Sequence, residues 1–98
     1  MTIDEKNVVQ GISQRASKGT PILDAIQEEV DRYQKRIDED RAEIAKIDKQ
    51  IAKLKKQDSD ANRSKIERLE GSKDYRQGSI ERRSELKRVA QNINPKDF

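Results

Sequence analysis

A cluster of acidic side chains near the middle of the chain is the first candidate for chemistry. It consists of Asp38, Glu39, Asp40 and Glu43. Its i, i+3 and i+4 spacings are those at which carboxylates on one helix can share a metal ion. Basic residues are interleaved with the acids, however, and the chain has no histidine, the commonest zinc ligand and general base. We therefore interpret the cluster as a solvated acidic surface and expect no metal site.

Other signatures of catalysis and of cofactor binding are missing from the sequence. The chain has no cysteine, which excludes a disulfide framework and a thiolate metal site. It has no nucleophile paired with a base, no phosphate-binding loop and no glycine-rich nucleotide fingerprint. We therefore expect a protein that is not an enzyme, with no catalytic residue, cofactor or metal.

A stripe of lysines is the second candidate. Lys46, Lys49, Lys53 and Lys56 follow one another at helical spacings of 3, 4 and 3 residues. They belong to a segment, residues 46–68, with eight basic and four acidic residues. Such a stripe can follow the phosphates of a nucleic acid, although no aromatic residue lies nearby for base stacking. Polyanion binding and an ordinary solvated face are the two interpretations.

Bulk composition indicates an elongated helical protein. Charged residues make up 42% of the 98 residues and hydrophobic residues only 31%, with a net charge of +3. The apolar residues are too few to fill a compact core. Only their strict periodicity along the chain argues against disorder. The N-terminus lacks the long apolar run of a signal peptide or membrane span. The expected location is cytoplasmic, with signal-less secretion left open.

Helix signals divide the chain into three parts. A capping box of Thr2 and Glu5 predicts a short helix over residues 3–17, ended by Gly19; we assign residues 1–19 to it and its linker. Thr20 as N-cap and Pro21 as first helical residue predict a long helix to about residue 57.

The remaining boundaries follow from turn residues and proline. The polar segment 58–62 predicts a turn, followed by a second long helix over about 61–91. Asn94 and Pro95 end this helix. We therefore assign residues 20–93 to a hairpin and residues 94–98 to a tail.

The first long helix has one narrow apolar stripe with heptad spacing. Its members are Ile26, Val30, Tyr33, Ile37, Asp40, Ile44, Ile47, Ile51 and Leu54. In a parallel dimer Arg36 would face Arg41 of the other helix, a like-charged pair. An antiparallel hairpin instead places the acidic residues of 21–45 beside basic residues of 77–93. We therefore predict an all-α, elongated antiparallel coiled-coil hairpin, with the short N-terminal helix packed at its open end.

The core of the open end is expected from apolar residues of all three helices. Its predicted members are Val8, Val9, Ile12, Leu23, Ile26, Val30, Leu86, Val89 and Ile93. Within the stripe, Asp40 is the single acid, and two interpretations stay open. It either pairs with Arg76, Arg82 or Arg83, or sets the register or oligomeric state as a buried polar residue.

The second long helix has two stripes that point in roughly opposite directions. One contains Ile66, Leu69 and Ile80, and the other contains Gly71, Tyr75, Gly78, Arg82, Leu86, Val89 and Ile93. Either the helix changes phase near Gly71, or each stripe packs on a different partner. The residues predicted for a partner or self-association interface are Tyr75, Gly78, Leu86, Val89 and Ile93, with the core of the hairpin as their alternative role.

These features favour a non-enzymatic adaptor or accessory protein that acts by docking helices and by oligomerising. Because so polar a hairpin is marginally stable alone, we predict a homo-oligomer, most simply a dimer, and a second helical protein as partner. The alternative is a nucleic-acid-associated protein that uses the lysines of the hairpin tip.

Overall fold

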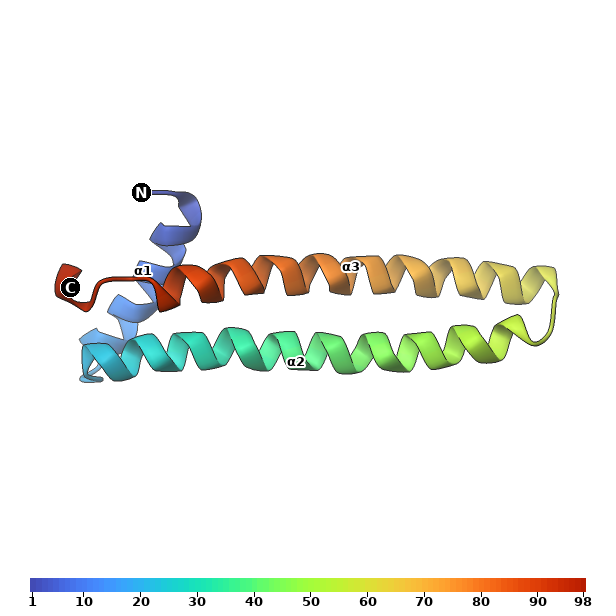
Figure 1. Ribbon diagram of the computed structural model, residues 1–98, viewed down its shortest axis with the longest axis horizontal. Coiled ribbons are helices and arrows are strands. Elements are labelled where there is room, and N and C mark those ends of the chain that lie inside the picture. The colour runs from blue at the N-terminus through green and yellow to red at the C-terminus, as the bar shows by residue number, and fades with distance from the viewer.

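The computed structural model describes residues 1–98 as three α-helices and one short 3-10 helix. The helices are α1 (Ile3–Ser17), α2 (Ile22–Lys55) and α3 (Asp60–Gln91), followed by η1 (Pro95–Asp97). Helices α2 and α3 run antiparallel as a hairpin, and α1 crosses its open end (Figure 1). The molecule measures 59 × 22 × 19 Å. The predicted all-α hairpin with a short N-terminal helix is therefore confirmed.

Local signals near the N-terminus explain where α1 ends and α2 begins. Thr2 caps α1, because its Oγ1 accepts a hydrogen bond from the backbone N–H of Glu5 at 3.1 Å. Gly19 follows α1 with a φ of +99°, which a glycine adopts without strain. The prediction that Thr20 is the N-cap of α2 is wrong. Its N–H donates to the carbonyl of Arg15 at 3.2 Å, so Thr20 closes α1. Pro21 precedes the first residue of α2 instead.

The turn of the hairpin lies slightly earlier than predicted. Ser59 caps α3 by accepting a hydrogen bond from the N–H of Asn62 at 3.1 Å. The Asn62 side chain donates to the carbonyls of Leu54 at 3.3 Å and Gln57 at 2.9 Å. Residues 60–62 therefore form the first turn of α3, and the connection is confined to residues 56–59.

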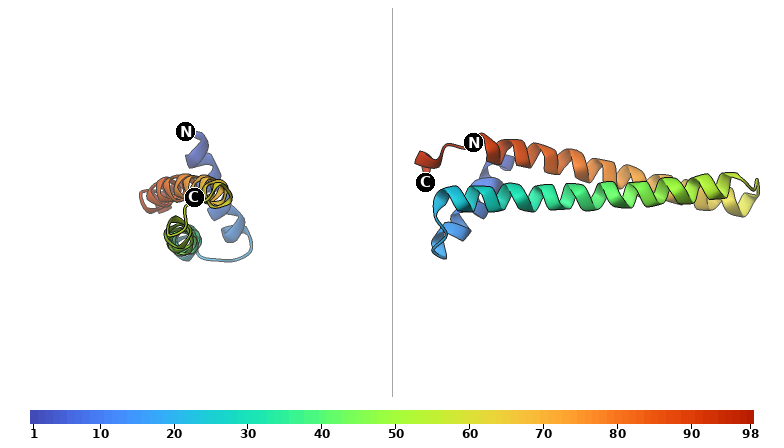
Figure 2. Two further views of the ribbon diagram at one scale, coloured as in Figure 1. Left: turned by 90° about the vertical axis from the view of Figure 1, so that its right-hand side faces the viewer. Right: turned by 60° about the horizontal axis from the view of Figure 1, so that its bottom comes forward.

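The stripe predicted on α2 forms the seam of the hairpin, with every member buried or half-buried. The facing side of α3 is a single continuous seam that combines the first predicted stripe with Leu86 and Ile93 of the second, while Gly71, Tyr75, Gly78 and Arg82 of the second stripe are exposed. Its half-buried or buried members are Asn62, Ile66, Leu69, Lys73, Arg76, Ile80, Arg83, Leu86, Ala90 and Ile93. Helix α3 needs no phase change, because long basic side chains fill the middle of the seam with their aliphatic stems. Figure 2 shows the two long helices crossing at a shallow angle.

The apolar core lies at the open end, where all three helices meet. It consists of Val8, Ile12, Ala25, Val30, Tyr33, Leu86 and Ala90, with Ile26, Val89 and Ile93 packed against it. The expected core residue Leu23 is instead 69% exposed. Helix α1 packs on the side of α2 that carries Ala25, whose small side chain lets the two helices approach, and Leu23 points away from this contact.

Candidate functional site

A completely buried carboxylate joins α1 to the hairpin. Glu29 of α2 lies beneath Gly11 of α1, and its two oxygens accept hydrogen bonds from two arginines. Arg15 of α1 donates to Oε2 through Nη1. Arg32 donates to Oε1 through Nη2 and, at 3.1 Å, through Nε. The Arg15–Glu29–Arg32 cluster is therefore a charged contact between α1 and α2.

The surroundings of Glu29 keep it ionised. Burial alone would raise its pKa, but the hydrogen bonds from Arg32 and the positive charges of Arg32 and Arg15 lower the pKa below its ordinary value of 4.5. Burial and the neighbouring carboxylate raise the pKa of Tyr33, over whose ring the Arg32 guanidinium lies at 5.0 Å. A carboxylate held between two guanidinium groups is a poor proton carrier, so the cluster is suited to holding α1 in place.

This cluster was not predicted from the sequence. No buried role was expected for Glu29, because ionised side chains are seldom fully buried. A signal was present in Gly11 and Ala25, two small residues that allow α1 and α2 to approach closely. Gly11 and Arg15 are separated by four residues and so lie on one side of α1.

A second buried acid, Asp40, lies in the middle of the hairpin seam. Its Oδ1 accepts a hydrogen bond from Nη1 of Arg76 at 2.8 Å, while Oδ2 is buried without a hydrogen-bond partner. Burial would raise the pKa of Asp40, but the hydrogen bond from Arg76 and the positive charges of Arg36 and Arg76 lower it. The predicted pairing with a basic residue of the second helix thus occurs, with Arg76 as the partner.

The Asp40–Arg76 pair also favours the observed register of α3 along α2. A shift of α3 that brought Ile80 opposite Asp40 would leave a buried carboxylate facing an apolar side chain, at a large desolvation cost. A second cross-hairpin pair joins Lys73 to Asp48 at 2.8 Å. Of the basic residues predicted to face the acidic half of α2, Arg82 lies 3.6 Å from Asp4 of α1 instead. Arg88 pairs with Glu85 of its own helix.

The lysines predicted to bind polyanions lie on the exposed side of α2 near the turn. Lys46 pairs with Glu43 at 3.5 Å. Lys49, Lys53 and Lys56 are exposed and have no carboxylate within ion-pair distance. A shallow groove of about 490 Å³ runs beside them, with a lining that includes two leucines and three basic residues. Those basic residues are Lys53, Lys65 and Arg68.

The residues predicted for a partner interface are divided between two places. Tyr75, 74% exposed, and Gly78 lie on the outer side of α3. Leu86 is buried in the core of the open end. Val89 and Ile93 pack against that core and also line a groove of about 370 Å³ together with Val9 of α1 and Phe98. Within one molecule these five residues do not form one surface.

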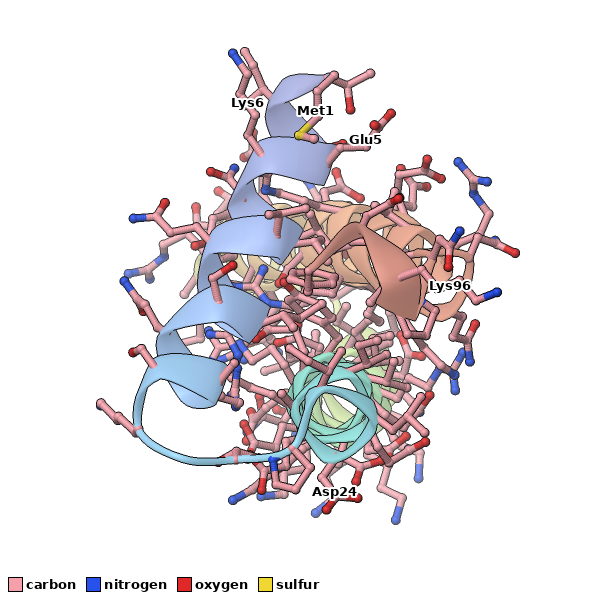
Figure 3. All side chains as sticks on the ribbon, turned by 90° about the vertical axis from the view of Figure 1, so that its left-hand side faces the viewer. Met1, Glu5, Lys6, Asp24 and Lys96 are labelled. Carbon is pink, nitrogen blue, oxygen red and sulfur yellow. The ribbon has the colours of Figure 1, made fainter.

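Exposed apolar side chains gather at the open end. Five large apolar side chains remain exposed in the whole molecule: Met1, Ile3, Leu23, Tyr75 and Phe98. All except Tyr75 belong to the parts of the chain at the open end, where both termini lie (Figure 1). Figure 3 looks onto this end and shows α1 lying across the ends of α2 and α3, with Met1 at its outer end.

The structure has no group of three or more Asp and Glu side chains placed to hold a metal ion. None of its helices combines the length and apolar composition needed to cross a membrane. Comparison of the chain with protein-family models, with curated proteins and with solved structures finds no match.

Proposed function

We propose that this chain is a non-enzymatic interaction protein that forms a homodimer through its open end and presents two helical arms to other proteins. The observation that carries the proposal is the segregation of its surface. Four of the five exposed large apolar side chains lie at the open end, and the arm beyond it is strongly charged. Exposed apolar surface that is confined to one region is typical of protein–protein contacts.

The size of the core supports a second copy as the occupant of the open end. Only 12 of 98 residues are buried, and the radius of gyration is 18.6 Å. A compact chain of this length has a radius of about 13 Å. So small a core contributes little stability, and a dimer contact at the open end would enlarge it where it already exists.

The arms have a different role in this proposal. Their charged surfaces do not favour apolar packing of one arm on another, so they extend from the paired open ends. Tyr75 is the one large apolar side chain exposed along an arm, and it lines a groove of about 530 Å³ with Leu69 and Gly71. We assign the docking of a partner helix to this groove.

Size-exclusion chromatography coupled to light scattering, which measures the mass in solution, tests whether the protein is a dimer. The expected mass at micromolar concentration is twice the 11.3 kDa of one chain. Replacing Leu23 and Phe98 by Asp should give monomers, because both side chains lie at the open end. The matched control, Tyr75→Asp, should remain dimeric. A monomeric wild-type protein, or dissociation of the control as well, refutes the open-end dimer.

A second candidate function is binding of a nucleic acid by the turn end of the hairpin. It is favoured by six basic residues there that have no carboxylate within ion-pair distance: Lys49, Lys53, Lys55, Lys56, Lys65 and Arg68. Phosphate binding by these residues should weaken steeply as salt rises, whereas docking of an apolar helix should not. Changing Lys46, Lys49, Lys53 and Lys56 to Glu should abolish binding of an oligonucleotide, and unchanged affinity refutes this candidate.

A further inference from the structure

A groove on the side of the molecule brings together basic residues from two helices. It has a volume of about 620 Å³, and α1, α2 and α3 all contribute to its walls. Its lining contains five basic side chains and a single acidic one, Glu39. The basic side chains are Arg32, Lys35 and Arg36 from α2 and Arg82 and Arg83 from α3.

Some of this positive charge is compensated within the protein. Arg32 contacts the buried Glu29, Arg36 lies 3.9 Å from Glu39, and Arg82 lies 3.6 Å from Asp4. Lys35 and Arg83 have no carboxylate within ion-pair distance. Arg83 instead donates a hydrogen bond to the hydroxyl of Ser79 at 3.1 Å. Two positive charges thus remain without an acidic partner, one on each wall of the groove.

Like charges so arranged repel one another. Lys35 and Arg83 have no acidic partner and lie on opposite walls of the groove. Three further cations line the same groove, and their carboxylate partners offset part of their charge. A bound anion would relieve this repulsion, because its negative charges would lie between the two walls.

The geometry points to a small phosphate-bearing ligand with two or more negative charges. Four of the five basic groups are guanidinium groups, whose paired N–H donors match the oxygens of a phosphate. The volume of the groove is within the range of small-molecule sites. The walls are polar side chains on rigid helices, with the Tyr33 ring and Leu86 as the apolar lining. We infer that this groove binds a soluble phosphate ester or oligophosphate between α2 and α3.

This site is separate from the three surfaces assigned above. Its basic residues are absent from the apolar groove at the open end, from the Tyr75 groove and from the lysine groove near the turn. Because Asn7 of α1 lines the groove, a ligand held there would also favour the docked position of α1.

Titration calorimetry of the full chain with pyrophosphate, at constant ionic strength, tests the inference. We expect saturable binding of one pyrophosphate per chain. Replacing Lys35 and Arg83 by Gln should weaken binding by roughly a hundredfold, because each substitution removes a charge-assisted hydrogen bond to the anion and so reduces the affinity about tenfold. The matched control replaces Lys53 and Lys56 by Gln, which removes the same charge near the turn. Equal weakening by both pairs of substitutions would show nonspecific attraction and overturn the site.

Two further outcomes decide the location and class of the ligand. Circular dichroism should show that the Lys35→Gln, Arg83→Gln variant remains helical, because glutamine keeps part of the aliphatic stem with which Arg83 packs in the seam and neither residue loses an ionic partner. In NMR spectra, pyrophosphate should shift the side-chain signals of Asn7 and Arg83. Shifts confined to residues near the turn overturn the inference. So does binding of poly-glutamate without binding of pyrophosphate, which would indicate an acidic protein segment as the ligand.

Discussion

Gly11→Ala tests whether Glu29 is held rigidly beneath α1. A Cβ atom at Gly11 would lie 2.5 Å from Oε2 and 3.0 Å from Cδ of Glu29. The carboxylate has little freedom to move aside, because it is completely buried and bonded to Arg15 and Arg32. Alanine would therefore displace either the charged cluster or α1 itself.

The magnitude follows from two opposing effects. Alanine in place of glycine within a helix stabilises it by about 1 kcal/mol. Overpacking of a filled site costs about 1–3 kcal/mol, so Gly11→Ala should be neutral or destabilise the protein by up to about 2 kcal/mol. Gly78 of α3 is the matched control, because a Cβ there has no neighbour within 4 Å. Gly78→Ala should stabilise the protein by about 1 kcal/mol.

Thermal unfolding followed by far-UV circular dichroism measures both variants. For a domain of this size, 1 kcal/mol corresponds to about 4–8 °C in Tm. The Tm of Gly11→Ala should therefore lie at least about 4 °C below that of Gly78→Ala. In a Glu29→Ala background, Gly11→Ala should become stabilising, because the obstructing carboxylate is gone. Equal stabilisation by Gly11→Ala and Gly78→Ala in the wild-type background would refute the buried position of Glu29.

Two further predictions concern the buried acids. Asp40→Leu should raise Tm, by an amount that corresponds to about 1 kcal/mol. The reason is that Oδ2 has no hydrogen-bond partner, while Arg76, 32% exposed, remains in contact with water after the substitution. A lower Tm at unchanged mass would contradict this prediction. Stability should fall on acidification, because Glu29 and Asp40 have pKa values in the folded protein below their ordinary 4.5 and 3.8. Their contribution is complete above these ordinary values and is lost as pH falls through the lowered pKa values. Urea unfolding between neutral and strongly acidic pH measures this loss, and Glu29→Gln should show less of it than the wild type.

The seam of α2 was predictable because its apolar residues repeat with heptad spacing over its whole length. The seam of α3 was not, because Lys73, Arg76 and Arg83 occupy its middle. These residues are polar by type, yet their aliphatic stems cover the partner helix while their charged ends reach acids or solvent. A pattern of residue types cannot distinguish such positions from exposed ones, so the apolar residues of one seam were divided between two predicted stripes.

The contacts at the open end depend on tertiary packing. The burial of Glu29 follows from which side of α2 receives α1, and that choice is made by Gly11, Ala25 and the cluster with Arg15. The cationic groove was missed for the same reason. Arg32 and Arg83 are far apart in the sequence and share a groove only once the register of the hairpin is known.

The proposed dimer is tested most directly by the distance between its two hairpin turns. The chain has no cysteine, so Gln57→Cys at the exposed turn accepts a single spin label. If the open ends are joined and the arms extend away from each other, pulsed electron resonance should find the two labels farther apart than the 59 Å length of one molecule. Labels close together in the dimer would mean that the arms pack side by side, which contradicts the account.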